Sequence, residues 1–267
     1  MLNKSSVHFT TLSLALSVGL TLYASIPATA ESPQTPIRQT TPNRGQIRSG
    51  RLRFRLPKVG APRTREPGAS RGSSNCSNQE KSVMALLPNT NVGLTLAERP
   101  TLFVAIPSSS AQQAEFTLHD EENQQEALYK TKIPIPSTAG IVSISLPSDA
   151  DSPQLEVGKK YRWSFSVICD AEDRAADIFV EGWVQRMEPS ATLVKDLQKA
   201  TERDRPVLYA EAGLWLDTIA SLADLRNASP NDSSLVTDWE DLLKAVNLGK
   251  VAKEPLIKLE TNTSSTP

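Results

Sequence analysis

The sequence predicts an α+β fold, in which an antiparallel β-sandwich of about seven strands is followed by a small C-terminal helical hairpin region. Short apolar runs separated by Pro, Gly, Asn, Asp and Ser recur between residues 83 and 187. One of these runs alternates apolar and polar residues, as a strand with one buried face does. Beyond Pro189 the apolar residues recur at helical spacing instead. The chain therefore changes once from strands to helices.

The clearest predicted strand covers residues 160–169, where Tyr161, Trp163 and Phe165 alternate with polar residues. Successive side chains of a strand point to opposite faces, so these rings share one apolar face with Cys169. The last run, 178–187, is apolar on both faces, and we expect the helical tail to cover it. The predicted strands are residues 83–87, 101–106, 114–119, 127–133, 140–146, 160–169 and 178–187.

Three helices are expected after the strands. The first follows Ser190, a suitable N-cap, and the second runs from Pro206 to Arg226 with the proline in its first turn. The third begins at Ser233 or Ser234 and ends at Gly249. The second and third helices form an antiparallel hairpin that cannot bury its own apolar face. It must therefore pack on the sheet or on a partner.

The first 30 residues have the three parts of a secretory signal peptide. Lys4 precedes an apolar run over residues 12–24, and small residues at Ala28 and Ala30 precede Glu31. The run of about 13 residues is shorter than the roughly 20 that a membrane-spanning helix needs. We therefore expect cleavage after Ala30, no membrane span afterwards, and an exported protein in the periplasm or outside the cell.

Residues 31–75 carry ten basic residues against two acidic ones and are rich in Pro, Arg and Ser. Such a segment is expected to be a disordered linker, with ordering conceivable at 52–56, where apolar and basic residues alternate. It could contact anionic lipid, an anionic polymer, an acidic partner or its own acidic body, but a solvated linker is the simplest interpretation. Nucleic acid is not an expected partner, because Phe54 is the only aromatic residue in this arm.

The expected organisation follows from these patterns. It comprises a signal peptide (1–30), a basic linker (31–75), a β-sandwich domain (76–188), a helical region packed on the sheet (189–257) and a loose tail (258–267).

The chain has two cysteines, Cys76 and Cys169. An even count in an exported protein favours a disulfide bond between them, and two unpaired buried thiols are the alternative. In the chain-entropy treatment, a bridge across so long a loop stabilises the fold by about 4–5 kcal/mol.

Six segments of the sequence form a combination that is specific to one family. They are Gly60–Pro62, Gly68–Gly72, Leu155–Phe165, Cys169–Asp170, Val180–Arg186 and Tyr209–Trp215. Together they resemble the "domain of unknown function 928" family of exported bacterial proteins. The resemblance implies export and the order of strands before helices, and it implies no activity, substrate or catalytic residue.

No catalytic set is evident. His119 is the only histidine after residue 30, and no nucleophile-elbow motif accompanies it, so we predict no catalytic residues, no cofactor and no transition-metal site. The acidic stretch after Cys169 is a weak calcium-loop candidate, because four acids could supply oxygen ligands; a hydrophilic hairpin loop is the simpler interpretation. The four acids are Asp170, Glu172, Asp173 and Asp177.

These patterns favour a non-catalytic envelope or extracellular interaction protein, whose partner is an envelope protein, an extracellular protein or an anionic polymer. One alternative is a glycosidase-like hydrolase that uses carboxylates such as Glu181 or Asp170. Another is a carbohydrate-binding module with Trp183 on its surface, although the positions of all four tryptophans fit core stripes better.

Overall fold

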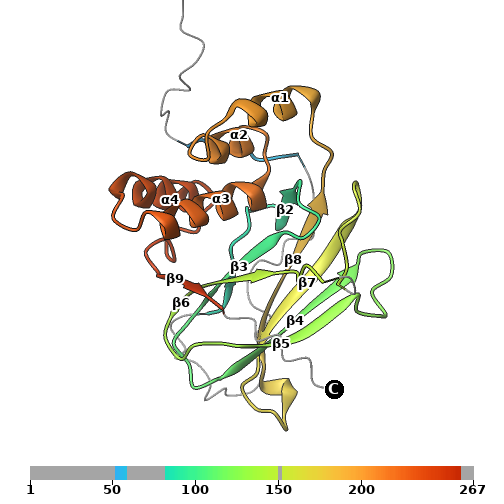
Figure 1. Ribbon diagram of the computed structural model, residues 1–267. Coiled ribbons are helices and arrows are strands. Elements are labelled where there is room, and N and C mark those ends of the chain that lie inside the picture. Colours follow the sequence, from blue (N-terminus) through green and yellow to red (C-terminus); the bar gives the residue numbers. More distant parts are fainter. Residues whose placement is uncertain (1–51, 59–81, 150–151, 260–267) are drawn as a thin grey trace, which may run out of the picture. The chain divides into compact units, whose positions relative to one another are not determined.

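The computed structural model describes residues 52–58, 82–149 and 152–259, which all lie within one unit, Ile47–Pro267. In this part of the chain eight strands precede four α-helices and a ninth strand follows them (Figure 1). The strands are β1 (Met84–Ala85), β2 (Val92–Thr95), β3 (Thr101–Ile106), β4 (Gln113–Asp120), β5 (Tyr129–Pro134), β6 (Gly140–Ser145), β7 (Lys160–Val167), β8 (Ile178–Arg186) and β9 (Leu256–Lys258). The helices are the 3-10 helix η1 (Arg174–Ala176), α1 (Ala191–Lys199), α2 (Arg205–Glu211), α3 (Trp215–Ala228) and α4 (Ser233–Ala245).

The strands form two mixed sheets. One has the order β1-β3-β6-β9 and the other has the order β2-β8-β7-β4-β5. β2 is parallel to β8 and β9 is parallel to β6, whereas the other paired strands are antiparallel. The α+β class is therefore confirmed, and the prediction of a purely antiparallel sandwich is wrong.

The two parallel strands are the ones that the sequence did not reveal. β2 has four residues and β9 has three, too few to display a strand period. Tertiary packing places them: Val92 pairs with Trp183 in register, and Ile257 pairs with Val142. A parallel pair needs a long connection between its strands, so local sequence carries no signal for either.

The inner faces of both sheets meet in one hydrophobic core. In β7 the predicted alternation is confirmed, because Tyr161, Trp163, Phe165 and Val167 are all buried and the residues between them are half-exposed. The Trp163 ring lies 6.4 Å from the ring of Phe116 on β4, centroid to centroid. Residues of β3 and β6 belong to the same cluster.

The four α-helices lie together on one side of the two sheets (Figure 1). The indole N–H of Trp215 on α3 donates a buried hydrogen bond of 2.7 Å to the Leu86 carbonyl. The ring of Trp239 on α4 lies edge-on to Phe103 of β3, with 6.4 Å between the centroids. The four-stranded sheet is thus covered on both faces, which explains why β3 is buried along almost its whole length.

The helical region differs from the prediction in two places. The expected helix 206–226 is two helices, α2 and α3, with a break at Gly213. The third helix ends at Ala245 rather than near Gly249, because Asn247 adopts the left-handed conformation with φ of 62°. Within the described ranges, no helix has both the length and the apolarity that crossing a bilayer requires.

Candidate functional site

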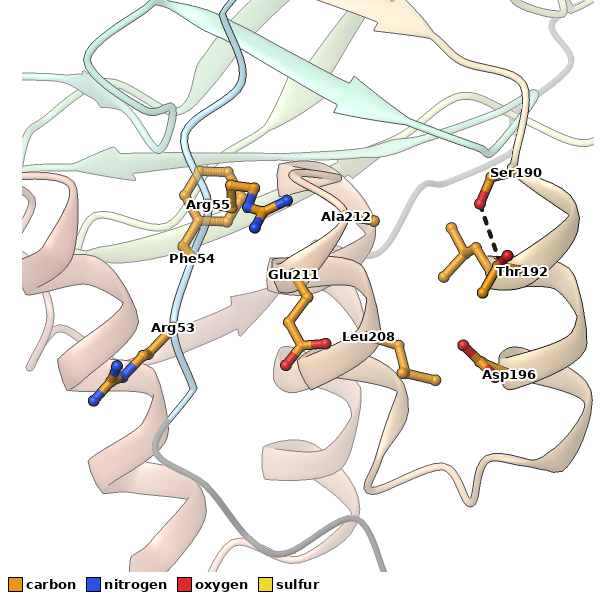
Figure 2. A pocket seen from close by; sticks show the side chains of 10 residues that line it. Arg53, Phe54, Arg55, Ser190, Thr192, Asp196, Leu208, Glu211 and Ala212 are labelled. Carbon is orange, nitrogen blue, oxygen red and sulfur yellow. Dashed lines mark hydrogen bonds between the residues drawn. The ribbon is translucent and has the colours of Figure 1, made fainter. Parts of the chain in front are cut away.

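A groove of about 650 Å³ lies between α1, α2 and the extended segment 52–58 (Figure 2). Two parts of the chain that are far apart in the sequence meet there, the segment 52–58 and the consecutive helices α1 and α2. The groove is lined by Arg53, Phe54, Arg55, Ser190, Thr192, Leu193, Asp196, Leu208, Glu211 and Ala212.

The first wall is the segment 52–58, which is fixed to the body by alternate residues. Leu52 is buried in the core, and the ring of Phe54 packs edge-on against Trp215 with 4.9 Å between the centroids. The backbone N–H of Arg55 donates a 3.0 Å hydrogen bond to the carbonyl of Ala210. Since the chain is extended, Arg53 and Arg55 point away from the core and are exposed.

Gly213 allows this wall to approach the turn between α2 and α3. Its φ is 76°, and a Cβ atom at this position would lie 3.0 Å from the carbonyl oxygen of Arg55. A side chain here would be strained by the backbone conformation and would also push against the segment. The glycine at the break between α2 and α3 therefore also allows the wall 52–58 to lie close to α2.

The opposite wall is α1. Ser190 caps the helix, as predicted, by accepting a 3.2 Å hydrogen bond from the N–H of Leu193. None of the nine residues of α1 is buried, and its apolar side chains Leu193 and Leu197 are only half-buried. A helix this short is not stable alone in water, so its contacts with α2 and with the cluster around Trp183 hold it.

The lining combines apolar and charged side chains. Phe54, Leu193 and Leu208 are half-buried and form the apolar part. In Figure 2, Arg55 and Asp196 lie on opposite sides of the groove, and Leu208 and Glu211 of α2 lie between them.

Four charged side chains line the groove, and all of them are exposed. None takes part in a hydrogen bond or ion pair within the described ranges. The four are Arg53, Arg55, Asp196 and Glu211. The groove can therefore offer both signs of charge around an apolar centre to a ligand.

The carboxylate proposed for catalysis, Glu181, lies in an ion pair. The Nε atom of Arg162 donates to Glu181 at 3.2 Å, and a second guanidinium nitrogen bonds the same oxygen. Asp170, the other named carboxylate, accepts a 2.8 Å hydrogen bond from the N–H of Glu172 in the loop after β7. His119 is half-buried on β4, where its register partner is Arg162. The structure does not join these side chains into one catalytic set among the described residues.

All four tryptophans are buried, as their positions in the predicted stripes indicated. Trp183 is the one that had been considered for a surface. It is 5% exposed and packs with Val92, Leu94 and Leu214. Leu193 and Tyr209 from the helices complete its surroundings, so its face of β8 is covered.

Three of the four acids of the calcium-loop candidate, Asp170, Asp173 and Asp177, use their carboxylates to stabilise the loop before β8. Asp173 caps η1 by accepting a 3.0 Å hydrogen bond from the N–H of Ala175. Asp177 accepts from the N–H of Cys169 at 3.3 Å and pairs with Arg174, while Glu172 donates its N–H to Asp170. No three His, Cys, Asp or Glu side chains of the described residues are grouped to hold a metal ion.

Cys169 is half-buried directly after β7 and packs against the core. Cys76 lies outside the described residues, so the pairing of the two cysteines stays a prediction.

One notable side chain had not been identified from the sequence. Asp217, in the first turn of α3, accepts a 3.0 Å hydrogen bond from the N–H of Leu96. Burial raises the pKa of this carboxyl group from its ordinary 3.8 to about 6, although hydrogen bonds from Leu96 and Thr95 act in the opposite direction. Because Asp217 was expected in the middle of one long helix, nothing in the sequence marked it as a contact between β2 and α3.

The fold and the groove define a two-sheet α+β protein with a helical layer and a cleft at the edge of that layer. The chain belongs to the family described as "Domain of Unknown Function (DUF928)", whose model matches residues 66–256. The resemblance noted in the sequence is thereby confirmed. A search of curated proteins found no match.

Proposed function

We propose that this is an exported, non-catalytic interaction protein that binds a segment of another envelope or extracellular protein in the groove between α1, α2 and residues 52–58. Export is supported by the signal-peptide pattern of residues 1–30. The single observation that carries the binding role is the lining of the groove. It combines half-buried apolar side chains with charged groups that have no partner within the described ranges.

The size of the groove suits a short piece of polypeptide. Its volume of about 650 Å³ lies within the range of roughly 300–1,000 Å³ that is usual for ligand sites. The helix α1 has no buried residue, and its half-buried Leu193 lines the groove, where a ligand could cover it. Burial of that stripe would supply the hydrophobic part of the binding free energy.

The other candidate functions have less support. An anionic polymer in the groove would meet Asp196 and Glu211 as well as Arg53 and Arg55, so the charges of the lining give it no net attraction. A hydrolase based on Glu181 would have to use a carboxylate that is paired with Arg162. A carbohydrate-binding surface built on Trp183 would need a side chain that is 5% exposed.

A photo-cross-linking experiment tests the proposal in the native host. A photoreactive amino acid replaces Asp196 in the full-length chain, and a control chain carries it at Lys132, an exposed residue of the edge strand β5. We expect one major protein adduct at position 196 that is absent at position 132. Mass spectrometry then locates the cross-linked segment of the partner.

A synthetic peptide of that segment provides the quantitative step. It should bind the mature protein in calorimetry, and binding should weaken about tenfold in Glu211→Lys but not in Lys132→Glu. Identical adducts at both positions, or equal affinity for all three proteins, would exclude the groove as the binding site.

A further inference from the structure

We infer that the groove selects a segment in which one apolar residue lies between an acidic residue and a basic residue, with the acidic residue towards Arg55 and the basic residue towards Asp196. This inference rests on the proposed function and adds the chemistry of the ligand. It follows from the order in which the side chains occur across the groove.

The apolar centre comes from three elements at once. Phe54 of the extended segment, Leu208 of α2 and Leu193 of α1 line the groove, and each is half-buried. In Figure 2, Leu208 extends from α2 towards α1. An aliphatic side chain of the ligand that covered these three would remove apolar surface from water on both partners.

The charges stand on the two sides of that centre. Arg55 belongs to the 52–58 wall, and its guanidinium group is directed towards the groove, whereas Asp196 belongs to α1 (Figure 2). Arg53 lies on the outer rim of the same wall as Arg55, and Glu211 lies on α2 towards the middle. These opposite charges favour a ligand that carries one acidic and one basic residue. They also favour one orientation of its chain across the groove, because the reversed ligand would place like charges together.

The walls are also fixed independently of these charges. The backbone of Arg55 is held by its hydrogen bond to Ala210, and α1 is held by its Ser190 cap and by packing on α2. The charged groups themselves are exposed and have no partner within the described ranges. Reversing one charge therefore changes ligand choice without removing a contact on which the fold depends.

Selection from a displayed library of random nine-residue peptides tests the inference on the mature protein. The wild-type protein should enrich peptides in which an acidic, an apolar and a basic residue occur in one single order along the peptide, either this order or its reverse but not both. Arg55→Glu should lower the preference for the acidic residue about tenfold, and Asp196→Lys should do the same for the basic residue. The double variant should enrich the opposite order from the one that the wild-type protein selects. Lys132→Glu, on the far edge of the sheet, should leave the selected peptides unchanged.

The outcomes separate this inference from the proposed function. Peptides that lack the charge pattern and are lost only when Leu208→Asp disrupts the apolar centre would overturn the inference and leave the groove as a binding site. Peptides that bind all groove variants equally would overturn both, and selection of polyanionic sequences would do the same. Glu211→Lys is a second acidic-side variant if Asp196→Lys does not fold, as judged by circular dichroism.

Discussion

At the scale of single residues, two glycines with positive φ differ in their surroundings. Gly158 has φ of 85° and no atom within 4 Å of the place where a Cβ atom would be. Gly213 has φ of 76°, and there the carbonyl oxygen of Arg55 lies only 3.0 Å from that place. At Gly158 only the backbone conformation favours glycine. At Gly213 the absence of a side chain also leaves room for residues 52–58 beside α2.

This difference predicts unequal costs for the two alanine substitutions. Gly158→Ala should destabilise the protein by about 1 kcal/mol, the cost of a left-handed backbone for an L-residue. Gly213→Ala should cost about 2–3 kcal/mol, because the segment must also move. Urea unfolding of both variants measures the two values, and equal costs would mean that the segment does not depend on the glycine.

Asp217 is the other residue whose surroundings have a measurable consequence. Its carboxyl group is buried beneath the end of β2, and burial is the largest contribution to its raised pKa of about 6. Between pH 4 and pH 6 the folded protein therefore holds a proton that the unfolded chain has released. Under those conditions the free energy of unfolding falls as the pH rises.

The expected size of this effect follows from the shift from 3.8 to about 6. It corresponds to about 3 kcal/mol of stability that is present at pH 4 and lost above pH 6. Asp217→Asn keeps an acceptor for the N–H of Leu96 and carries no charge, so it should be more stable than wild type at pH 7. Its advantage should disappear at pH 4. Asp196→Asn, at an exposed position, is the control and should follow the wild-type curve.

At the scale of elements, the segment 52–58 behaves as part of the folded body rather than as part of a linker. Leu52 and Phe54 alternate with Arg53 and Arg55, and the alternation matches their burial. The ordering considered for residues 52–56 is therefore observed, whereas most of the rest of the basic arm lies outside the described residues. Its side chains are attached through Leu52 in the core and through the aromatic contact of Phe54 with Trp215.

Phe54→Ala should release this element. The loss of a half-buried ring should cost about 1–3 kcal/mol and should expose Arg53 and Arg55 to trypsin. Phe179→Ala is the matched control, because Phe179 on β8 is 37% exposed and should cost no more than about 0.5 kcal/mol. Limited proteolysis followed by mass spectrometry reports the cleavage. Equal cleavage of both variants would show that the ring does not fix the segment.

The elements also show where sequence patterns suffice. β7 and the start of α1 could be predicted, because strict alternation in one and a serine cap in the other act within a few residues. The break at Gly213 was not predicted, and the close approach of the Arg55 carbonyl to this glycine comes from a segment distant in sequence. The groove was missed for the same reason: each wall is ordinary alone, and only their meeting makes a site.

At the scale of the whole molecule, we propose a processed and covalently linked chain. Cleavage after Ala30 would leave Glu31 as the first residue, and a bond between Cys76 and Cys169 would join the start of the sandwich region to the end of β7. Both expectations depend on export to an oxidising compartment.

Intact mass spectrometry of the protein isolated from its host tests both. The mass should correspond to residues 31–267, and reduction should add about two mass units. Replacing both cysteines with serine should lower the free energy of unfolding by about 2–5 kcal/mol. A full-length chain with two free thiols would contradict the proposed compartment.

The position of β9 affects when the fold can be completed. This strand lies near the end of the chain yet pairs with β6, more than a hundred residues earlier. A nascent polypeptide thus cannot complete the four-stranded sheet until the residues of β9 have left the ribosome, and such distant pairings form slowly. If the protein is exported, as we propose, this delay would keep the four-stranded sheet incomplete, and the chain easier to translocate, until β9 has been synthesised.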